Sequence, residues 1–312
     1  MTDGSADPGG GNEAVSRRPG RLGVGVVGAG RVGAVLGSAL RAAGHAVVGV
    51  SAVSAASRER AEVLLPGVPV LAVPEVVERA ELVLLTVPDD ALPGLVDGLA
   101  ATRAWQPGQL VVHTSGRHGW RVLDPAVALG AIPLALHPAM TFTGTSLDLV
   151  RLTDCCFGVT APGAVLPIGQ ALVVEMGAEP VVVAEEMRPL YHAALAHGAN
   201  HLVTLVTQAL DLLGAAGVEQ ADRVIGPLLS AALDNVLRQG DAALTGPVAR
   251  GDAGTVGAHV EAIGGSGVED ALATYRMLAR TTADRALGAG RLRPDAATSL
   301  LAVLAEDGIS PP

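Results

Sequence analysis

The stretch Val26-Val27-Gly28-Ala29-Gly30-Arg31-Val32-Gly33 decides how the first half of the chain folds. It closes one apolar run, Leu22–Val27, and opens a helical pattern that leads to a second β-branched run, Ala46–Ser51. In such a strand–turn–helix unit, the first glycine permits the tight turn, the second lets a diphosphate approach the backbone, and the third permits close helix packing. The free amides and positive dipole end of the helix N-terminus also favour phosphates. We therefore predict a dinucleotide site formed by Gly28, Ala29, Gly30, Arg31, Val32 and Gly33.

Strand-like and helical stretches alternate along the first half of the chain, which predicts a parallel sheet covered on both faces. After about residue 184, helical periodicity with glycine punctuation replaces them. The expected fold class is α/β: a doubly wound, mostly parallel Rossmann sheet followed by an all-α C-terminal domain. The expected parts are a disordered tail over 1–20, a Rossmann dinucleotide-binding domain over 21–184 and a helical substrate and dimerisation domain over 185–312.

The strands that these patterns predict are Leu22–Val27, Ala46–Ser51, Leu82–Val87, Leu110–His113 and Ile132–Leu136, with Phe157–Thr160 and Pro180–Val183 as two further candidates. The predicted helices are 31–43, 55–64, 74–80, 89–103, 118–129 and 164–177, then 186–213, 219–238, 253–263, 268–288 and 294–306.

Composition excludes several classes of function. The 312 residues carry 21 basic and 31 acidic side chains and six aromatic ones, which argues against a nucleic-acid partner. All 21 cations are arginine, so a Walker-type phosphate loop, a Schiff base and a lysine acid or base are excluded. The first 20 residues contain no apolar run, and the long uncharged stretches are interrupted by proline, glycine or histidine. We expect a cytoplasmic protein that does not enter the membrane, with neighbouring Cys155 and Cys156 as small buried side chains rather than a redox pair.

The residues after the second strand indicate which dinucleotide binds. An NAD site usually offers an acid there for the ribose 2′-hydroxyl, but the first acid, Glu59, already lies inside the next predicted helix. Ser51, Ser54 and Arg58 occupy that reach instead, and arginine suits a 2′-phosphate. We predict NADP as the cofactor. The alternative is that Ser54 only caps the helix and Arg58 is solvated.

Polar residues follow three other predicted strands, and ligands of open α/β sheets bind at the carboxyl ends of the strands. These segments are Thr86-Val87-Pro88-Asp89, His113-Thr114-Ser115-Gly116 and His137-Pro138. Val87 and Pro88 are predicted to contact the cofactor. Asp89 is either a helix N-cap or a site residue, and His113 and His137 are either structural or functional.

Taken together, these segments resemble a known group of proteins. The strings that carry the resemblance are Gly28–Gly33, Thr86–Asp89, His113–Gly116, His137–Phe142, Tyr191-His192 with Asn200, and Thr245–Asp252. They are similar to Rossmann-like oxidoreductases with a helical C-terminal domain of unknown function, in the superfamily of 6-phosphogluconate dehydrogenase, ketopantoate reductase and pyrroline-5-carboxylate reductase. The resemblance covers roughly residues 21–308. It implies a nicotinamide-dependent reductase that dimerises through the helical domain, without naming a substrate.

One departure from that superfamily concerns the proton donor. Its hydroxyacid branch uses a lysine four residues before an asparagine; here the asparagine corresponds to Asn200 and Ala196 takes the lysine's place. We therefore expect histidine, asparagine and serine to replace lysine. The predicted catalytic residues are His113 with Ser115 near the nicotinamide, Asn200 orienting the substrate and Arg250 holding its carboxylate, with His137 and His192 as alternative donors.

The predicted reaction is NADP(H)-dependent reduction of a small carbonyl or imine acid, with a ketopantoate-like substrate left open and no metal required. One alternative is a non-catalytic NADP(H)-binding sensor. Others are a cyclic-imine reductase of the pyrroline-5-carboxylate type and a deazaflavin partner in place of a substrate. For the second domain, Asp252 is predicted to cap a helix, and Arg250 is either a carboxylate ligand or part of a surface ion pair.

Overall fold

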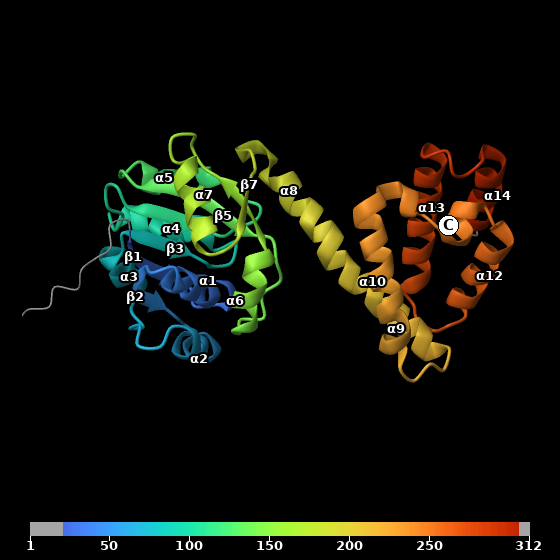
Figure 1. Ribbon diagram of the computed structural model, residues 1–312, viewed down its shortest axis with the longest axis horizontal. Coiled ribbons are helices and arrows are strands. Elements are labelled where there is room, and N and C mark those ends of the chain that lie inside the picture. The colour runs from blue at the N-terminus through green and yellow to red at the C-terminus, as the bar shows by residue number, and fades with distance from the viewer. Residues whose placement is uncertain (1–20, 306–312) are drawn as a thin grey trace, which may run out of the picture. The chain divides into compact units, whose positions relative to one another are not determined.

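Seven strands form one sheet in the computed structural model, which describes residues 21–305; the tail predicted over 1–20 lies outside the described residues. The strand order is β2-β1-β3-β4-β5-β6-β7 (Figure 1). The first five strands are parallel to one another, whereas β6 and β7 run in the opposite direction. The predicted doubly wound, mostly parallel sheet is confirmed. The strands are β1 (Gly23–Val27), β2 (Ala46–Ser51), β3 (Leu82–Leu85), β4 (Leu110–His113), β5 (Ile132–Pro138), β6 (Cys156–Thr160) and β7 (Glu179–Val182).

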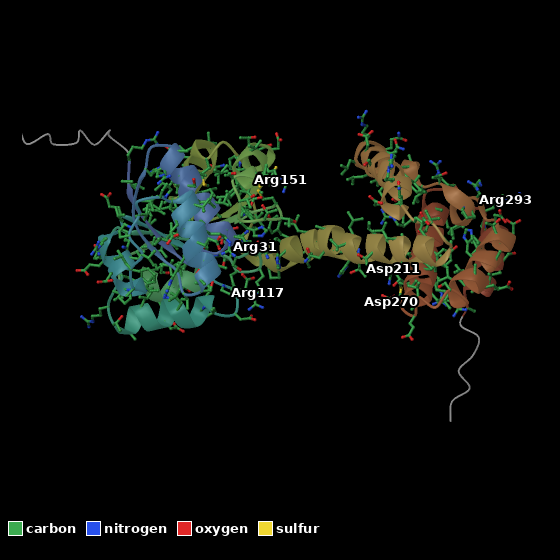
Figure 2. All side chains as sticks on the ribbon, turned by 90° about the horizontal axis from the view of Figure 1, so that it is seen from below. Arg31, Arg117, Arg151, Asp211, Asp270 and Arg293 are labelled. Atoms are coloured by element: carbon green, nitrogen blue, oxygen red, sulfur yellow. The ribbon has the colours of Figure 1, made fainter. Side chains whose placement is uncertain are left out.

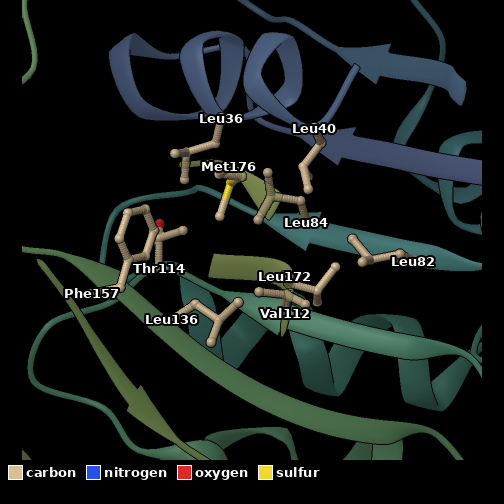
Figure 3. A pocket seen from close by; sticks show the side chains of 10 residues that line it. All are labelled: Leu36, Leu40, Leu82, Leu84, Val112, Thr114, Leu136, Phe157, Leu172 and Met176. Atoms are coloured by element: carbon tan, nitrogen blue, oxygen red, sulfur yellow. The ribbon is translucent and has the colours of Figure 1, made fainter. Parts of the chain in front are cut away.

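Helices cover both faces of this sheet because its central strands are apolar on both sides. Val24 and Val26 pack with α1, α2 and α7 on one face, and Val83 and Leu85 pack with α3, α4 and α5 on the other. Figure 3 shows the first of these layers, where side chains of α1 and α7 meet the sheet around a cavity too small for a ligand. The helices are α1 (Arg31–Ala42), α2 (Ala55–Leu64), α3 (Val73–Arg79), α4 (Leu92–Ala101), α5 (Asp124–Val127), α6 (Leu147–Arg151), α7 (Leu166–Glu175) and α8 (Arg188–Leu195).

Several element bounds differ from the prediction. Strand β3 stops at Leu85 and α4 starts only at Leu92, so Asp89 lies in the intervening turn and is not the helix N-cap, which is Ala91. The short helix α6 was not predicted, because five residues carry too little periodicity. Cys155 is buried as expected, but Cys156 is exposed, because successive residues of an extended chain point to opposite sides.

The boundary between the two parts of the chain also moves. Residue contacts divide the chain into a first unit that ends at Leu195 and a second unit that starts at Ala196. Residues 185–195 therefore belong to the first unit rather than to the helical one. The reason is a set of short contacts that hold this segment to the first unit, described below. Within the predicted helix 186–213, a π turn over Ala196–Asn200 separates α8 from the next helix.

In the second unit, every described element is helical. Its core is formed by small and aliphatic residues of the last four helices, among them Val256, Ala283 and Leu300. Among residues 21–305, no helix combines the length and apolar composition that crossing a membrane would require. Charged side chains, such as Arg31, Arg151 and Asp211, project from the ribbon (Figure 2). The helices are α9 (His201–Ala215), α10 (Ala221–Gln239), α11 (Gly246–Arg250), which was not predicted, α12 (Ala253–Gly264), α13 (Ala271–Gly288) and α14 (Pro294–Leu304).

Candidate active site

The glycine-rich turn between β1 and α1 has the geometry that its sequence predicts. Gly28 has φ +100°, a conformation that side chains with a Cβ rarely adopt. Its amide donates to Ser51 Oγ at 3.0 Å, and its carbonyl accepts from Thr86 Oγ1 at 2.6 Å. A Cβ on Gly33 would overlap both the Gly28 carbonyl oxygen and Thr86 Oγ1. The ends of β2 and β3 therefore hold the turn in place from both sides.

Gly30 leaves the space in front of α1 open. It is the N-cap of α1, and a Cβ added there would have no atom within 4 Å. No side chain caps the helix and its first turn contains no acid, so its amides and dipole remain available to an anion. These residues fit the diphosphate of a dinucleotide, with Ala29, Arg31 and Val32 forming the rest of the turn.

The three residues predicted to bind a 2′-phosphate have different roles. Ser51 is buried and occupied by the Gly28 amide, and Ser54 caps α2 by accepting from the Ser57 amide at 3.1 Å. Arg58 is exposed, and its Nε lies 3.4 Å from the carbonyl oxygen of Ala52 in the loop after β2. Of the three, only the guanidinium remains available to a phosphate.

A second arginine, Arg60, was missed by the sequence reasoning. Its Nη1 lies 3.4 Å from the Ala29 carbonyl oxygen, and a Cβ on Gly144 would lie 3.0 Å from side-chain carbons of both Arg31 and Arg60. Two guanidinium-bearing side chains thus border the glycine-rich turn. The signal in the sequence was the Arg58-Glu59-Arg60 triplet, in which every second residue is basic.

The contacts of His113 favour the structural alternative over the predicted role of proton donor. It is fully buried, its Nε2 bonds the Gly119 carbonyl oxygen at 2.9 Å, and its Nδ1 accepts from the Ser115 amide at 3.2 Å. Burial lowers its pKa to about 3, so at neutral pH the ring is uncharged and its one N–H, on Nε2, is used in the bond to Gly119. Ser115 is also buried and its Oγ accepts from the His118 amide at 3.2 Å. Both side chains stabilise the turn after β4.

The other two predicted histidines come together with a tyrosine that was not predicted to act. His137, at the end of β5, lies with Nδ1 3.0 Å from the Tyr191 hydroxyl oxygen. The His137 ring packs edge-on against the rings of Tyr191 and His192, with centroids 5.6 and 5.8 Å apart. All three side chains are partly exposed, and burial lowers the pKa of His137 to about 4. Among the site residues, this imidazole–phenol group therefore combines exchangeable protons with access to solvent.

Two glycines allow the α8 segment to pack this closely. A Cβ on Gly116 would overlap the His192 ring, and one on Gly119 would overlap the Glu185 carboxylate. That carboxylate instead accepts from the amides of Trp120 and Arg121 at 2.9 and 3.2 Å. The turn after β4 and the start of α8 therefore form a single structure.

Val87 and Pro88, predicted to contact the cofactor, lie in the loop after β3, directly after Thr86, which bonds the Gly28 carbonyl. Asn200 and Arg250 belong to the second unit and are exposed. Asn200 ends the π turn, where His197 Nδ1 approaches His201 Nδ1 at 3.1 Å. Arg250 ends α11, and the predicted N-cap of α12 is confirmed: Asp252 accepts from the Thr255 amide at 3.0 Å.

A Rossmann-like sheet with a glycine-rich turn and a helical second unit defines a class of dinucleotide-binding folds, and comparison with protein families places the chain more narrowly. The family model of the Rossmann-like domain matches residues 8–138. A domain of unknown function, DUF2520, matches residues 155–282. The two matches follow one another along the chain, and the resemblance found in the sequence is confirmed.

Solved structures share this fold. A candidate NADP oxidoreductase from Bacteroides fragilis is 22% identical with a TM-score of 0.71, covering 85% of this chain and 98% of that one. An imine reductase from Myxococcus stipitatus in complex with NADP+ is 18% identical with a TM-score of 0.64, covering 89% and 99%. A protein from Thermotoga maritima is 20% identical with a TM-score of 0.63, covering 86% and 99%. No curated protein matches the chain.

Proposed function

We propose that the protein is an NADP(H)-dependent oxidoreductase that reduces a small carbonyl or imine acid. The observation that carries this proposal is the open, uncapped helix N-terminus at Gly30, on the same sheet edge as the His137–Tyr191–His192 group. Strands β3 and β4 separate β1 from β5, so the two features lie about 14 Å apart at about 4.8 Å per strand. A dinucleotide anchored by its diphosphate at β1 extends along the strand ends over that distance.

The nicotinamide supplies the hydride, and the protein supplies position and a proton. Tyr191 suits the donor role, because the residue is partly exposed and its hydroxyl is bonded to an imidazole that can replace the proton. Burial raises the pKa of Tyr191, which keeps the hydroxyl protonated at neutral pH. His192 borders the same place and is the second candidate donor. Arg58 favours the 2′-phosphate of NADP over NAD, since no acid competes for that position.

Binding of NADPH by Gly30→Glu tests the cofactor site. The added carboxylate meets no neighbouring atom at its Cβ, so the variant should fold, but its charge repels a diphosphate. We expect NADPH affinity, measured by calorimetry, to fall at least 100-fold. The matched control is Gly94→Glu in α4, an exposed glycine with equally open space, which should bind as the parent does. Equal NADPH binding by parent and Gly30→Glu would refute the site.

A reductase screen separates catalysis from sensing. The purified protein is offered 2-oxo acids, linear and cyclic imines, and a deazaflavin, with NADPH oxidation followed at 340 nm. Imines are included because solved structures of this fold include imine reductases. Turnover of any of them that falls at least 100-fold in Tyr191→Phe supports the assigned donor. Tight NADPH binding without turnover of the whole panel favours the sensor.

We also propose that the protein is a homodimer through its helical unit. No residue of α10 is buried, yet Val224, Leu228, Leu233 and Leu237 are more than half exposed on more than one side of the helix. Large apolar side chains gathered on an exposed helix are typical of a surface that another protein surface covers. Sedimentation should show a dimer for the parent and for Val63→Glu, an exposed control in α2, and a monomer for Leu228→Glu. A dimeric Leu228→Glu would contradict the assignment.

A further inference from the structure

Arg188, the first residue of α8, is a fully buried cation; the charges of Glu185 and Asp89 act on it, but it forms no ion pair with either of them. Its side chain is 0% exposed, and within residues 21–305 its guanidinium takes part in no ion pair. It lies over the Tyr191 ring, 5.7 Å from the centroid. A buried charge that lacks a partner costs several kcal/mol, so a fold retains one only where something else compensates.

The hydrogen bonds of Arg188 leave one edge of the guanidinium free. Nη1 donates to the Gly158 carbonyl oxygen at 3.3 Å, while Nε and Nη2 have no partner among the described residues. Nε and Nη2 form the side-on edge of the group, where two N–H bonds point the same way. Two parallel donors match the two oxygens of a carboxylate, the bidentate arrangement that arginine forms most strongly.

The neighbours of the Arg188 guanidinium include the imidazole–phenol group. His137 stands opposite Gly158 in the β5–β6 pairing, and a Cβ on Gly158 would lie 2.7 Å from the Tyr191 oxygen and 3.1 Å from Arg188 Nη1. Glycine at 158 therefore lets both side chains approach the strand. Tyr191 and His137 are partly exposed, whereas the Arg188 side chain beside them is fully buried.

We propose that Arg188 is the carboxylate-binding residue of the active site, taking the acid group of a 2-oxo or 2-imino acid on its Nε–Nη2 edge. This inference rests on the proposed function for the identity of the ligand, and it replaces Arg250 in the role predicted from the sequence. With the carboxylate on Arg188, the adjacent carbonyl or imine carbon lies beside Tyr191 and His137. The site thus selects substrates in which the acid is directly next to the reacting carbon.

Calorimetry with linear 2-oxo acids of two to six carbons, their 2-oxo amides and inorganic phosphate tests this, each with and without NADP+. We expect at least one 2-oxo acid to bind the parent at least tenfold more tightly than its amide does, and Arg188→Met to lose that difference. The control is Arg121→Met, which removes an exposed arginine that also lies over an aromatic ring, Trp120, and should bind as the parent does. Equal binding of acid and amide by the parent, an acid preference retained in Arg188→Met, or preferential binding of phosphate would overturn the proposal.

A second readout follows the His137 imidazole by NMR. A carboxylate on Arg188 offsets the positive charge that faces this ring, so its midpoint of titration should rise when the acid binds, and should not move in Arg188→Met. The calorimetric arm without NADP+ separates the two hypotheses. Acid binding that persists while NADPH fails to bind supports the arginine site and rejects the proposed reaction, and the reverse result rejects the arginine site alone.

Discussion

Replacing Arg188 by methionine should make the protein more stable, which is unusual for the loss of a fully buried side chain. Burial lowers the pKa of Arg188 from 12.5 to about 10. A depressed pKa on a cation means that folding disfavours the charged form, and the cost is fully present at every pH below about 10. This lowering of the pKa corresponds to a cost of about 3 kcal/mol at pH 7.

Two smaller terms act on the same substitution. The Gly158 carbonyl loses its donor, which costs about 1 kcal/mol. Methionine is unbranched and flexible, so it can occupy much of the space that the arginine stem fills. The expected net gain is about 2 kcal/mol, or a rise of about 4–8 °C in melting temperature for a unit of this size.

Urea unfolding at pH 7, followed by tryptophan fluorescence, measures this gain. Both tryptophans, Trp105 and Trp120, lie in the first unit, so the signal reports the part of the chain that contains the substitution. Arg121→Met should leave the midpoint within about 0.5 kcal/mol of the parent, as surface substitutions usually do. A midpoint for Arg188→Met at or below that of the parent, with an unchanged slope, would show that the guanidinium is compensated in the folded protein and would refute the reasoning.

Three further predictions concern the cofactor turn and the buried histidine. Gly33→Ala forces a Cβ against the Gly28 carbonyl oxygen, so it should cost about 1–3 kcal/mol in urea unfolding and also weaken NADPH binding, whereas a normally stable variant would contradict the packing described. Ser54→Ala should cost about 1 kcal/mol of stability without changing the ratio of NADPH to NADH affinity, whereas Arg58→Ala should lower that ratio. If calorimetry shows that Ser54→Ala also changes the ratio, the serine belongs to the 2′-phosphate site. Because His113 has a pKa of about 3 against 6.5 when unfolded, its neutral form contributes stability above about pH 6.5 that is lost as the pH falls toward 3, by up to about 1.4 kcal/mol per pH unit. Between pH 7 and 4, the free energy of unfolding should fall less steeply with pH in His113→Gln than in the parent. The same pH dependence in both proteins would show that the ring is not buried in its neutral form.

The fold could be predicted from the sequence because its signals are local and repeated. Each buried strand is a short apolar run. In the glycine-rich turn, the structure shows why each glycine is needed: Gly28 has a positive φ, Gly30 leaves open space, and Gly33 allows close packing. The direction of β6 and β7 could not be read in this way, because an apolar run reports burial and not orientation. The short helices α6 and α11 were not predicted, because five residues carry too little periodicity.

The site was harder to predict than the fold, since a residue type does not say which bonds its atoms already make. His113 looked catalytic as an imidazole at a strand end, but the turn that follows uses both of its nitrogens. Ser54 looked like a phosphate ligand, but it caps α2. Arg188 was not singled out, since it lies within a predicted helix. The spacing of Arg188 and Tyr191, three residues apart on one helix face, was the available signal, and it acquires meaning only beside Gly158.

The distribution of satisfied and unsatisfied polar atoms separates structure from function in the first unit. Buried Asp148 accepts from the amides of Thr143 and Gly144, and buried Gln109 donates to two carbonyl oxygens, as expected of groups that hold loops in place. Arg188 keeps two donors unpaired in an equally buried position. Within residues 21–305, Arg21 and Arg276 each have one buried atom without a hydrogen-bond partner, and that of Arg21 lies 2.9 Å from a Glu175 oxygen, whereas Arg188 leaves both donors of one edge open. If Arg188→Met is more stable than the parent and no longer binds the acid, the two results together show that the charge of Arg188 destabilises the fold and serves to bind a ligand.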